Sequence, residues 1–107
     1  MSAISERIAA GQCVLIEPTL LLDKDSGGWF AVIFYYAAWK TKAGHARADR
    51  SCDFLRGRTR ADVDDQIAAI VELAGGESSC LLSEARSAEL LEAFREGRLS
   101  SELAGAV

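Results

Sequence analysis

The stretch GGWFAVIFYYAAWK, residues 27–40, decides the fold of this 107-residue chain. It holds both tryptophans and both tyrosines and opens with a glycine pair, which is typical of a long strand that follows a turn. Successive side chains of a strand point to opposite faces, and here both alternating sets are apolar or aromatic. The stretch therefore predicts a sheet that is covered on both faces. The chain's own helices would cover one face, and more of the chain, a second copy or a partner would cover the other.

A chain of this length is expected to form one domain, residues 1–107, that buries a core without cross-links. Its three cysteines are far apart and in no paired pattern, which favours neither a disulfide framework nor a zinc site. The first residues lack the basic and apolar stretches of a signal peptide. The apolar run is also shorter than the roughly 20 residues of a membrane-spanning helix. We therefore expect a cytoplasmic protein that makes no contact with a membrane.

Two further strands are predicted beside the aromatic one. Residues 12–22 form an apolar run in which Pro18 removes a backbone donor, so this strand belongs at an edge or carries a bulge. In the predicted strand 46–55, the odd-numbered side chains up to residue 53 are polar, and the even-numbered ones are apolar except Arg50. This alternation predicts a strand with one face in water and the other in the core.

Three helices complete the predicted fold. A short helix over residues 3–10 precedes the first strand, and two longer helices cover residues 60–74 and 84–96. Thr59 and Ser83 are suitable N-caps. This order predicts an α+β domain, with a three- to four-stranded antiparallel meander and two or three helices packed on one face. One core is expected to join the central strand to both long helices, through Val32, Ile33, Phe34, Ile67, Ile70, Leu91 and Phe94.

The first five predicted elements follow the order α-β-β-β-α, which resembles that of double-stranded-RNA-binding domains. The resemblance implies lysines at the start of the final helix, where the helix N-terminus faces phosphate. Here that helix instead begins with Ala61, Asp62, Val63, Asp64 and Asp65. Three carboxylates at this point would repel a phosphate backbone, which argues against this mode of RNA binding.

Basic residues gather in one segment of an otherwise acidic chain. The net charge is −4, yet residues 40–60 hold seven of the twelve basic side chains and only two acidic ones. Such a segment can steer an anionic partner toward the protein. It can also form ion pairs with Asp62, Asp64 or the acidic face of the last helix of the same molecule. Both interpretations stay open at the level of sequence.

No pattern of residues predicts a catalytic, metal-binding or cofactor-binding site. His45 is the only histidine, and Cys52 could reach it only if a bulge brought both to one side of the strand. The acidic cluster at the start of the 60–74 helix complements the positive end of the helix dipole. It lacks the further oxygen ligands and the glycine of a calcium loop. We therefore expect no cofactor.

The sequence predicts a small non-enzymatic protein-interaction module of bacterial or phage origin, a candidate inhibitor of a larger bacterial complex. In size and general character it is similar to anti-CRISPR proteins. The expected partner is a larger protein or protein–nucleic acid complex, and a homodimer through the sheet is a further expectation. Two alternatives remain, a nucleic-acid-binding accessory protein that uses residues 40–60 and a small enzyme that uses His45 with a cysteine. The predicted partner-binding residues are Trp29, Tyr35, Tyr36, Trp39, Arg47, Arg50, Arg56, Arg58 and Arg60.

Overall fold

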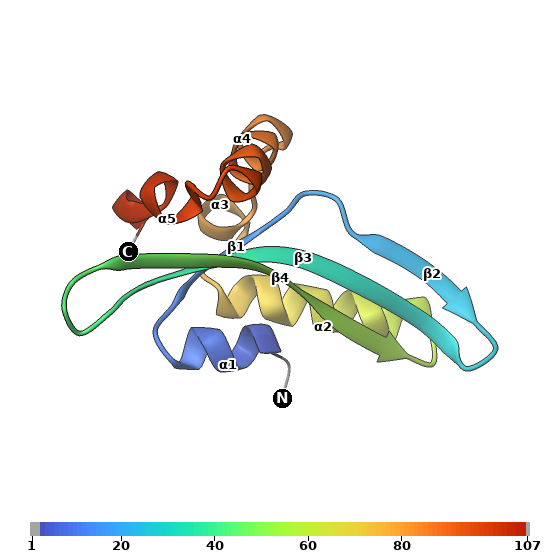
Figure 1. Ribbon diagram of the computed structural model, residues 1–107. Coiled ribbons are helices and arrows are strands. Elements are labelled where there is room, and N and C mark those ends of the chain that lie inside the picture. The colour runs from blue at the N-terminus through green and yellow to red at the C-terminus, as the bar shows by residue number, and fades with distance from the viewer. Residues whose placement is uncertain (1–2, 107) are drawn as a thin grey trace.

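The centre of the fold is the aromatic strand β3 (Gly28–Lys40), which pairs antiparallel with β4 (Ala46–Gly57) from Trp29 to Lys40. On its other side β3 pairs with two shorter strands, β1 (Cys13–Ile16) and β2 (Leu21–Asp25). The structure is a computed structural model that describes residues 3–106 (Figure 1). Its four-stranded antiparallel sheet with helices confirms the predicted α+β class.

Pro18 divides the predicted strand 12–22 into two segments on the same edge of β3. The backbone N–H of Glu17 still donates to the carbonyl of Phe34, at 2.9 Å, and the chain then leaves the sheet before it returns as β2. Because proline has no N–H to donate, the interruption falls on the edge side, as the sequence predicts. β2 continues to Asp25, so only residues 26 and 27 form the turn into β3.

Gly28 begins β3 in a conformation that only glycine adopts easily, with φ of +128°. A Cβ atom at this position would lie 2.5 Å from the carbonyl oxygen of Gly57, the last residue of β4. Gly44, in the β3–β4 turn, also has positive φ, at +83°, but a Cβ atom there would meet nothing within 4 Å. A side chain at either glycine would strain the backbone, but only one at Gly28 would also clash with another strand.

We expect Gly28→Ala to lower the free energy of unfolding by at least about 1 kcal/mol more than Gly44→Ala, because a backbone contact must also shift. Strain alone accounts for about 1–2 kcal/mol at each site. Urea unfolding of the two variants measures the difference. Equal losses would contradict the close approach of Gly28 to β4.

The odd-numbered residues of β3 face α1 (Ala3–Ala9) and α2 (Arg60–Leu73), and we call this side the α1/α2 face. Ile4, Val63 and Ile70 pack there in one buried cluster with residues of the sheet, among them Ala31, Ile33, Tyr35 and Ala37. The capping box of α2 is present, because the Thr59 hydroxyl accepts from the N–H of Asp62 and the Asp62 carboxylate accepts from that of Thr59. This local prediction is confirmed.

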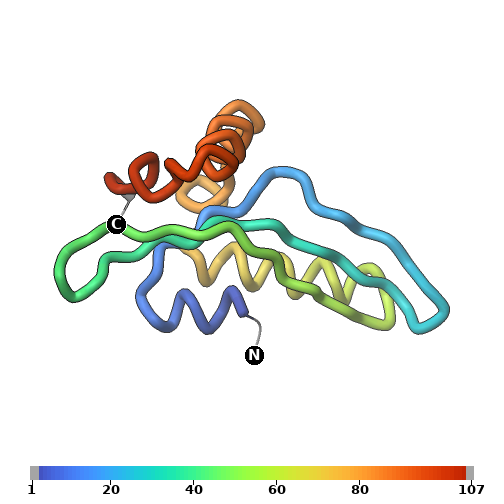
Figure 2. Tube along the Cα trace, viewed as in Figure 1, coloured from blue at the N-terminus to red at the C-terminus, as the bar shows by residue number. Residues whose placement is uncertain are grey.

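The opposite side of the sheet carries α4 (Glu84–Arg95) and α5 (Leu99–Glu102), and we call it the α4/α5 face. Leu90 and Leu99 form a second buried cluster with Tyr36 and Ala38 of β3. The short helix α3 (Glu77–Cys80) and a single parallel bridge between Ile16 and Leu81 lead the chain to this side. The helices thus lie on both faces rather than on one (Figures 1 and 2).

The structure therefore has two cores, whereas the sequence predicts one. Val32 and Phe34 lie on the α4/α5 face, while Ile33 lies on the other. In α4 the buried residues are Leu90 and Ala93, and Phe94 is 44% exposed. The expectation of a single core is wrong because a strand with two apolar faces supplies two separate layers.

The prediction for β4 placed its polar side chains in water and its apolar side chains in the core, and the structure shows the reverse for the centre of the strand. Its register with β3 places Asp53 opposite Ile33 and Asp49 opposite Ala37, so the polar set lies on the α1/α2 face. There Arg7 of α1 forms an ion pair with Asp49 at 3.0 Å, and the N–H of Ile4 donates to Asp53. The apolar set lies on the α4/α5 face, where Cys52 is exposed.

Candidate interaction surface

The C-terminal helices cover only part of the α4/α5 face. They pack on Tyr36, Ala38 and Ala48, and the part of the sheet toward the β2–β3 turn has no described helix over it (Figure 2). The register brings side chains of β2, β3 and β4 together there. We call this surface the open face, and its apolar members are Leu21, Phe30, Val32, Phe34, Cys52 and Phe54.

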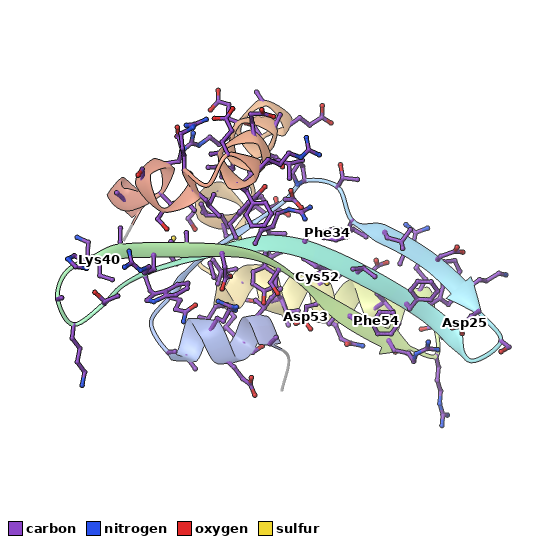
Figure 3. The ribbon with its side chains drawn as sticks, in the orientation of Figure 1. Asp25, Phe34, Lys40, Cys52, Asp53 and Phe54 are labelled. Carbon is purple, nitrogen blue, oxygen red and sulfur yellow. The ribbon has the colours of Figure 1, made fainter. Side chains whose placement is uncertain are left out.

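The open face is an exposed apolar surface. Leu21 is 52% exposed and Phe54 is 54% exposed, although both belong to a sheet. The rings of Phe30 and Phe54 stack with centroids 5.5 Å apart, which holds them flat across β3 and β4. Figure 3 labels Phe34, Cys52 and Phe54 along this part of the two strands. A contiguous exposed apolar surface of this kind is typical of an interaction site.

Two arginines of β4 border the open face and reach across the central strand. Arg50 lies 5.0 Å from the ring centroid of Phe34 and forms a two-bond ion pair with Glu17, at 2.9 and 3.3 Å. Arg56 lies 5.4 Å from the ring of Phe54 and bonds both carboxylate oxygens of Asp25, at 2.9 and 3.1 Å. Each guanidinium is thereby fixed in position by a carboxylate from the other edge of the sheet.

Glu17 is the centre of a buried polar cluster beside the open face. Its side chain is only 9% exposed, and besides Arg50 it accepts hydrogen bonds from the Tyr36 hydroxyl at 3.2 Å and from Ser87 of α4 at 3.4 Å. Burial raises the pKa of Tyr36, and the nearby Glu17 charge raises it further. Burial lowers the pKa of Arg50, but the hydrogen bonds and charge of Glu17 outweigh it and leave that pKa raised.

The cluster also lines a hollow of about 400 Å³ between Pro18, Leu21, Phe34 and Ser87. Glu17 was not among the site residues predicted from sequence. The available signal was an acidic residue inside the apolar run 12–22, because a carboxylate in such a place must find a partner when the strand is buried.

The predicted partner-binding aromatics do not form part of this surface. Tyr35 and Tyr36 are fully buried, one in each core, which removes both as contacts for a partner. Trp29 packs at the margin of the core on the α1/α2 face, with the Lys24 ammonium 5.9 Å from its ring. Trp39 is half-buried near the far end of β3. Neighbouring residues of a strand face opposite sides, so the six aromatics of β3 cannot share one surface.

The predicted arginines are also divided. Arg50 and Arg56 border the open face, whereas Arg47 lies on the other side of β4. Arg60 follows the strand and pairs with Asp64 at 3.7 Å, which is one of the internal pairs that the sequence allowed. Within residues 3–106, Arg47 and Arg58 have no ion pair.

The residues of the alternative enzyme hypothesis are not brought together. His45 lies in the β3–β4 turn, and seven residues of nearly extended chain place Cys52 about 20 Å away. Burial raises the pKa of both Cys13 and Cys80, which disfavours their reactive thiolate forms. In the described part of the chain, no three His, Cys, Asp or Glu side chains are grouped so that they could hold a metal ion.

None of the helices described within residues 3–106 has the length and apolar character needed to cross a membrane. No protein-family model matches this chain, and no curated protein or solved structure does either. The open face and its border are therefore the features of this chain that bear on its function.

Proposed function

We propose that this protein is a non-enzymatic interaction module that binds a partner protein through the open face. The observation that carries the proposal is a sheet face covered by helices over one half and exposed over the other, where Leu21 and Phe54 are each more than half exposed. The way in which the chain covers one half of this face indicates what kind of element would cover the other half. Because α4 and α5 pack their apolar sides on that half, the matching occupant of the open half is the apolar side of a partner's amphipathic helix.

The border of the open face supports the same proposal. Arg50 and Arg56 are held over aromatic rings by their carboxylate partners, so their positions are set before a partner binds. A preorganised surface loses less conformational entropy on association. The biological role that we attach to such a module is inhibition of a larger bacterial complex by occupation of one of its surfaces, as anti-CRISPR proteins do.

A second candidate function is nucleic-acid binding. It is favoured by Lys40, Lys42 and Arg47, which surround the β3–β4 turn, are exposed and have no ion pair among the described residues. A complex with phosphate weakens steeply as salt rises, whereas a complex through the open face does not. Affinity measured at 50 and 200 mM salt distinguishes the two functions.

The decisive variant is Leu21→Asp, which places a charge on the open face at a site that is already half in water. Its matched control is Leu73→Asp on α2, because Leu73 is 54% exposed and lies on the other side of the sheet. We expect Leu21→Asp to weaken the partner complex at least tenfold, about 1.4 kcal/mol, and Leu73→Asp to leave it unchanged. Quantitative pull-downs from bacterial lysate with the three proteins, followed by titration of the recovered partner, measure this difference. Equal binding by all three would contradict the proposal.

A further inference from the structure

The outer edge of β4 has open backbone positions in its middle. At one end the N–H of Ala48 donates to Ser100 of α5 at 3.1 Å, and at the other the carbonyl of Arg56 accepts from Gln66 of α2 at 2.8 Å. Both groups belong to even-numbered residues and bond to elements other than β3. Backbone groups alternate in direction along an antiparallel strand, so the even-numbered residues of β4 direct their N–H and C=O away from β3.

The opposite side of β3 gives the same result independently. The carbonyl of Phe34 accepts from the N–H of Glu17, on the β1 side, and Phe34 is paired with Cys52. Because the Phe34 carbonyl points toward β1, Phe34 and Cys52 form a pair of opposite residues that do not hydrogen-bond to each other. In such a pair the N–H and C=O groups of both residues point away from the partner strand. Arg50 and Cys52 therefore present outward N–H and C=O groups, and neither has a backbone partner among residues 3–106. The N–H of Phe54 bonds the side chain of Asp53. We call residues 50–54 the open edge.

We infer that two copies of this chain associate by antiparallel pairing of their open edges, with Cys52 on the two-fold axis. This register places Arg50 of each copy opposite Phe54 of the other. The chain already makes arginine–phenylalanine contacts twice on the same face, at Phe34 and at Phe54. The axis also places Ser51 opposite Asp53, so no two like charges lie directly opposite each other.

The carboxylates that come diagonally closest across the axis are those of Asp49 and Asp53. Each is already engaged by α1 of its own chain, Asp49 by the Arg7 guanidinium and Asp53 by the N–H of Ile4. A second copy fits this edge better than an unrelated extended segment, because residues 50–54 are complementary to the same five residues of another copy. One two-fold symmetric contact also pairs the exposed backbone groups of both copies at once.

The pairing is limited to the centre of β4. Ser100 at one end and Gln66 at the other already occupy the flanking backbone groups, so the contact spans residues 50–54. It uses the edge of the sheet, whereas the proposed partner uses the open face, so neither depends on the other. Association would bring Cys52 and Phe54 of both copies to one side and join their two open faces across the axis.

The test is the oligomeric state of the variant Cys52→Pro. Proline removes the outward N–H at the axis and leaves the β3 ladder intact, because that N–H does not point to β3. Cys52→Ser is the matched control, since it changes the same side chain and keeps the N–H. In sedimentation across a concentration series, we expect a dimer for the wild type and Cys52→Ser, and a dissociation constant at least tenfold weaker for Cys52→Pro. A wild type that stays monomeric, or a folded Cys52→Pro variant that dimerises equally well, would overturn the inference.

A second measurement does not depend on the folding of the proline variant. A short bismaleimide linker should join two Cys52 thiols in a protein that carries Cys13→Ser, because Cys52 is exposed and Cys80 is buried. The yield of linked dimer should fall when the protein is diluted before the linker is added, and no linked dimer should form in the Cys52→Ser variant. Absence of the linked species at high protein concentration would exclude an axis at Cys52. The Leu21→Asp variant should dimerise normally, so failure of the dimer and failure of the partner-binding proposal remain distinguishable.

Discussion

Truncation of Ile33 or Leu90 to alanine is expected to lower the free energy of unfolding by about 2–5 kcal/mol at each site. Ile33 is 1% exposed in the core under α1 and α2, and Leu90 is fully buried in the core under α4 and α5. Each truncation removes buried methyl groups and leaves a cavity that close-packed neighbours fill only in part. Because the cores lie on opposite faces of β3, the two losses should add in the double variant.

Phe94→Ala is the control for the orientation of α4. Its side chain is larger than that of leucine but 44% exposed, so its truncation should cost less than that of Leu90. Urea unfolding of the three single variants and the double variant, followed by circular dichroism, measures all the differences. A larger loss for Phe94→Ala than for Leu90→Ala would mean that α4 is rotated and that Phe94, as expected from sequence, faces the core.

The second large effect is expected at Glu17. Glu17→Leu leaves the Arg50 guanidinium and the Tyr36 hydroxyl without their acceptor beneath α4, and removal of one member of a buried ion pair costs about 3 kcal/mol. Removal of both charges is far less costly than removal of one. The double variant Glu17→Leu with Arg50→Met should therefore recover more than half of the loss. Thermal and urea unfolding of the single and double variants form the required cycle.

The exposed pair of Asp25 and Arg56 is the natural comparison for Glu17. Asp25 accepts two hydrogen bonds from Arg56, which hold its pKa below the usual range, with a further contribution from the N–H of Gly27. Because both side chains are in water, Asp25→Asn should leave the free energy of unfolding nearly unchanged. A loss at Asp25 as large as that at Glu17 would show that burial is not what makes the Glu17 cluster important.

Local features of this fold could be predicted because their causes lie within a few residues. The β3 stretch is apolar on both alternating sides, Pro18 interrupts the edge strand, and Thr59 with Asp62 begins α2. Each depends on backbone geometry or on hydrogen bonds between near neighbours. The open face was only partly predictable, because two apolar sides of a strand indicate two covers and do not say how far each cover extends.

The partners of the arginines could not be predicted. For internal ion pairs of the basic segment, the sequence offered Asp62, Asp64 and the last helix as partners, yet the carboxylates that Arg50 and Arg56 meet are Glu17 and Asp25. These contacts join residues 33 and 31 positions apart, across the central strand. Only the register of three adjacent strands brings them within hydrogen-bond distance.

By itself the sequence determined the α+β class, the antiparallel central strand and the start of α2, because hydrophobic periodicity and capping act locally. The tertiary structure alone decided which layer each face of the sheet meets. A period of two separates the faces of β4, but it does not say which face meets α1 and which meets water. The register with β3 and the path of the chain from α2 through α3 to α4 decide that, and they leave Phe54 exposed and Asp53 beside α1.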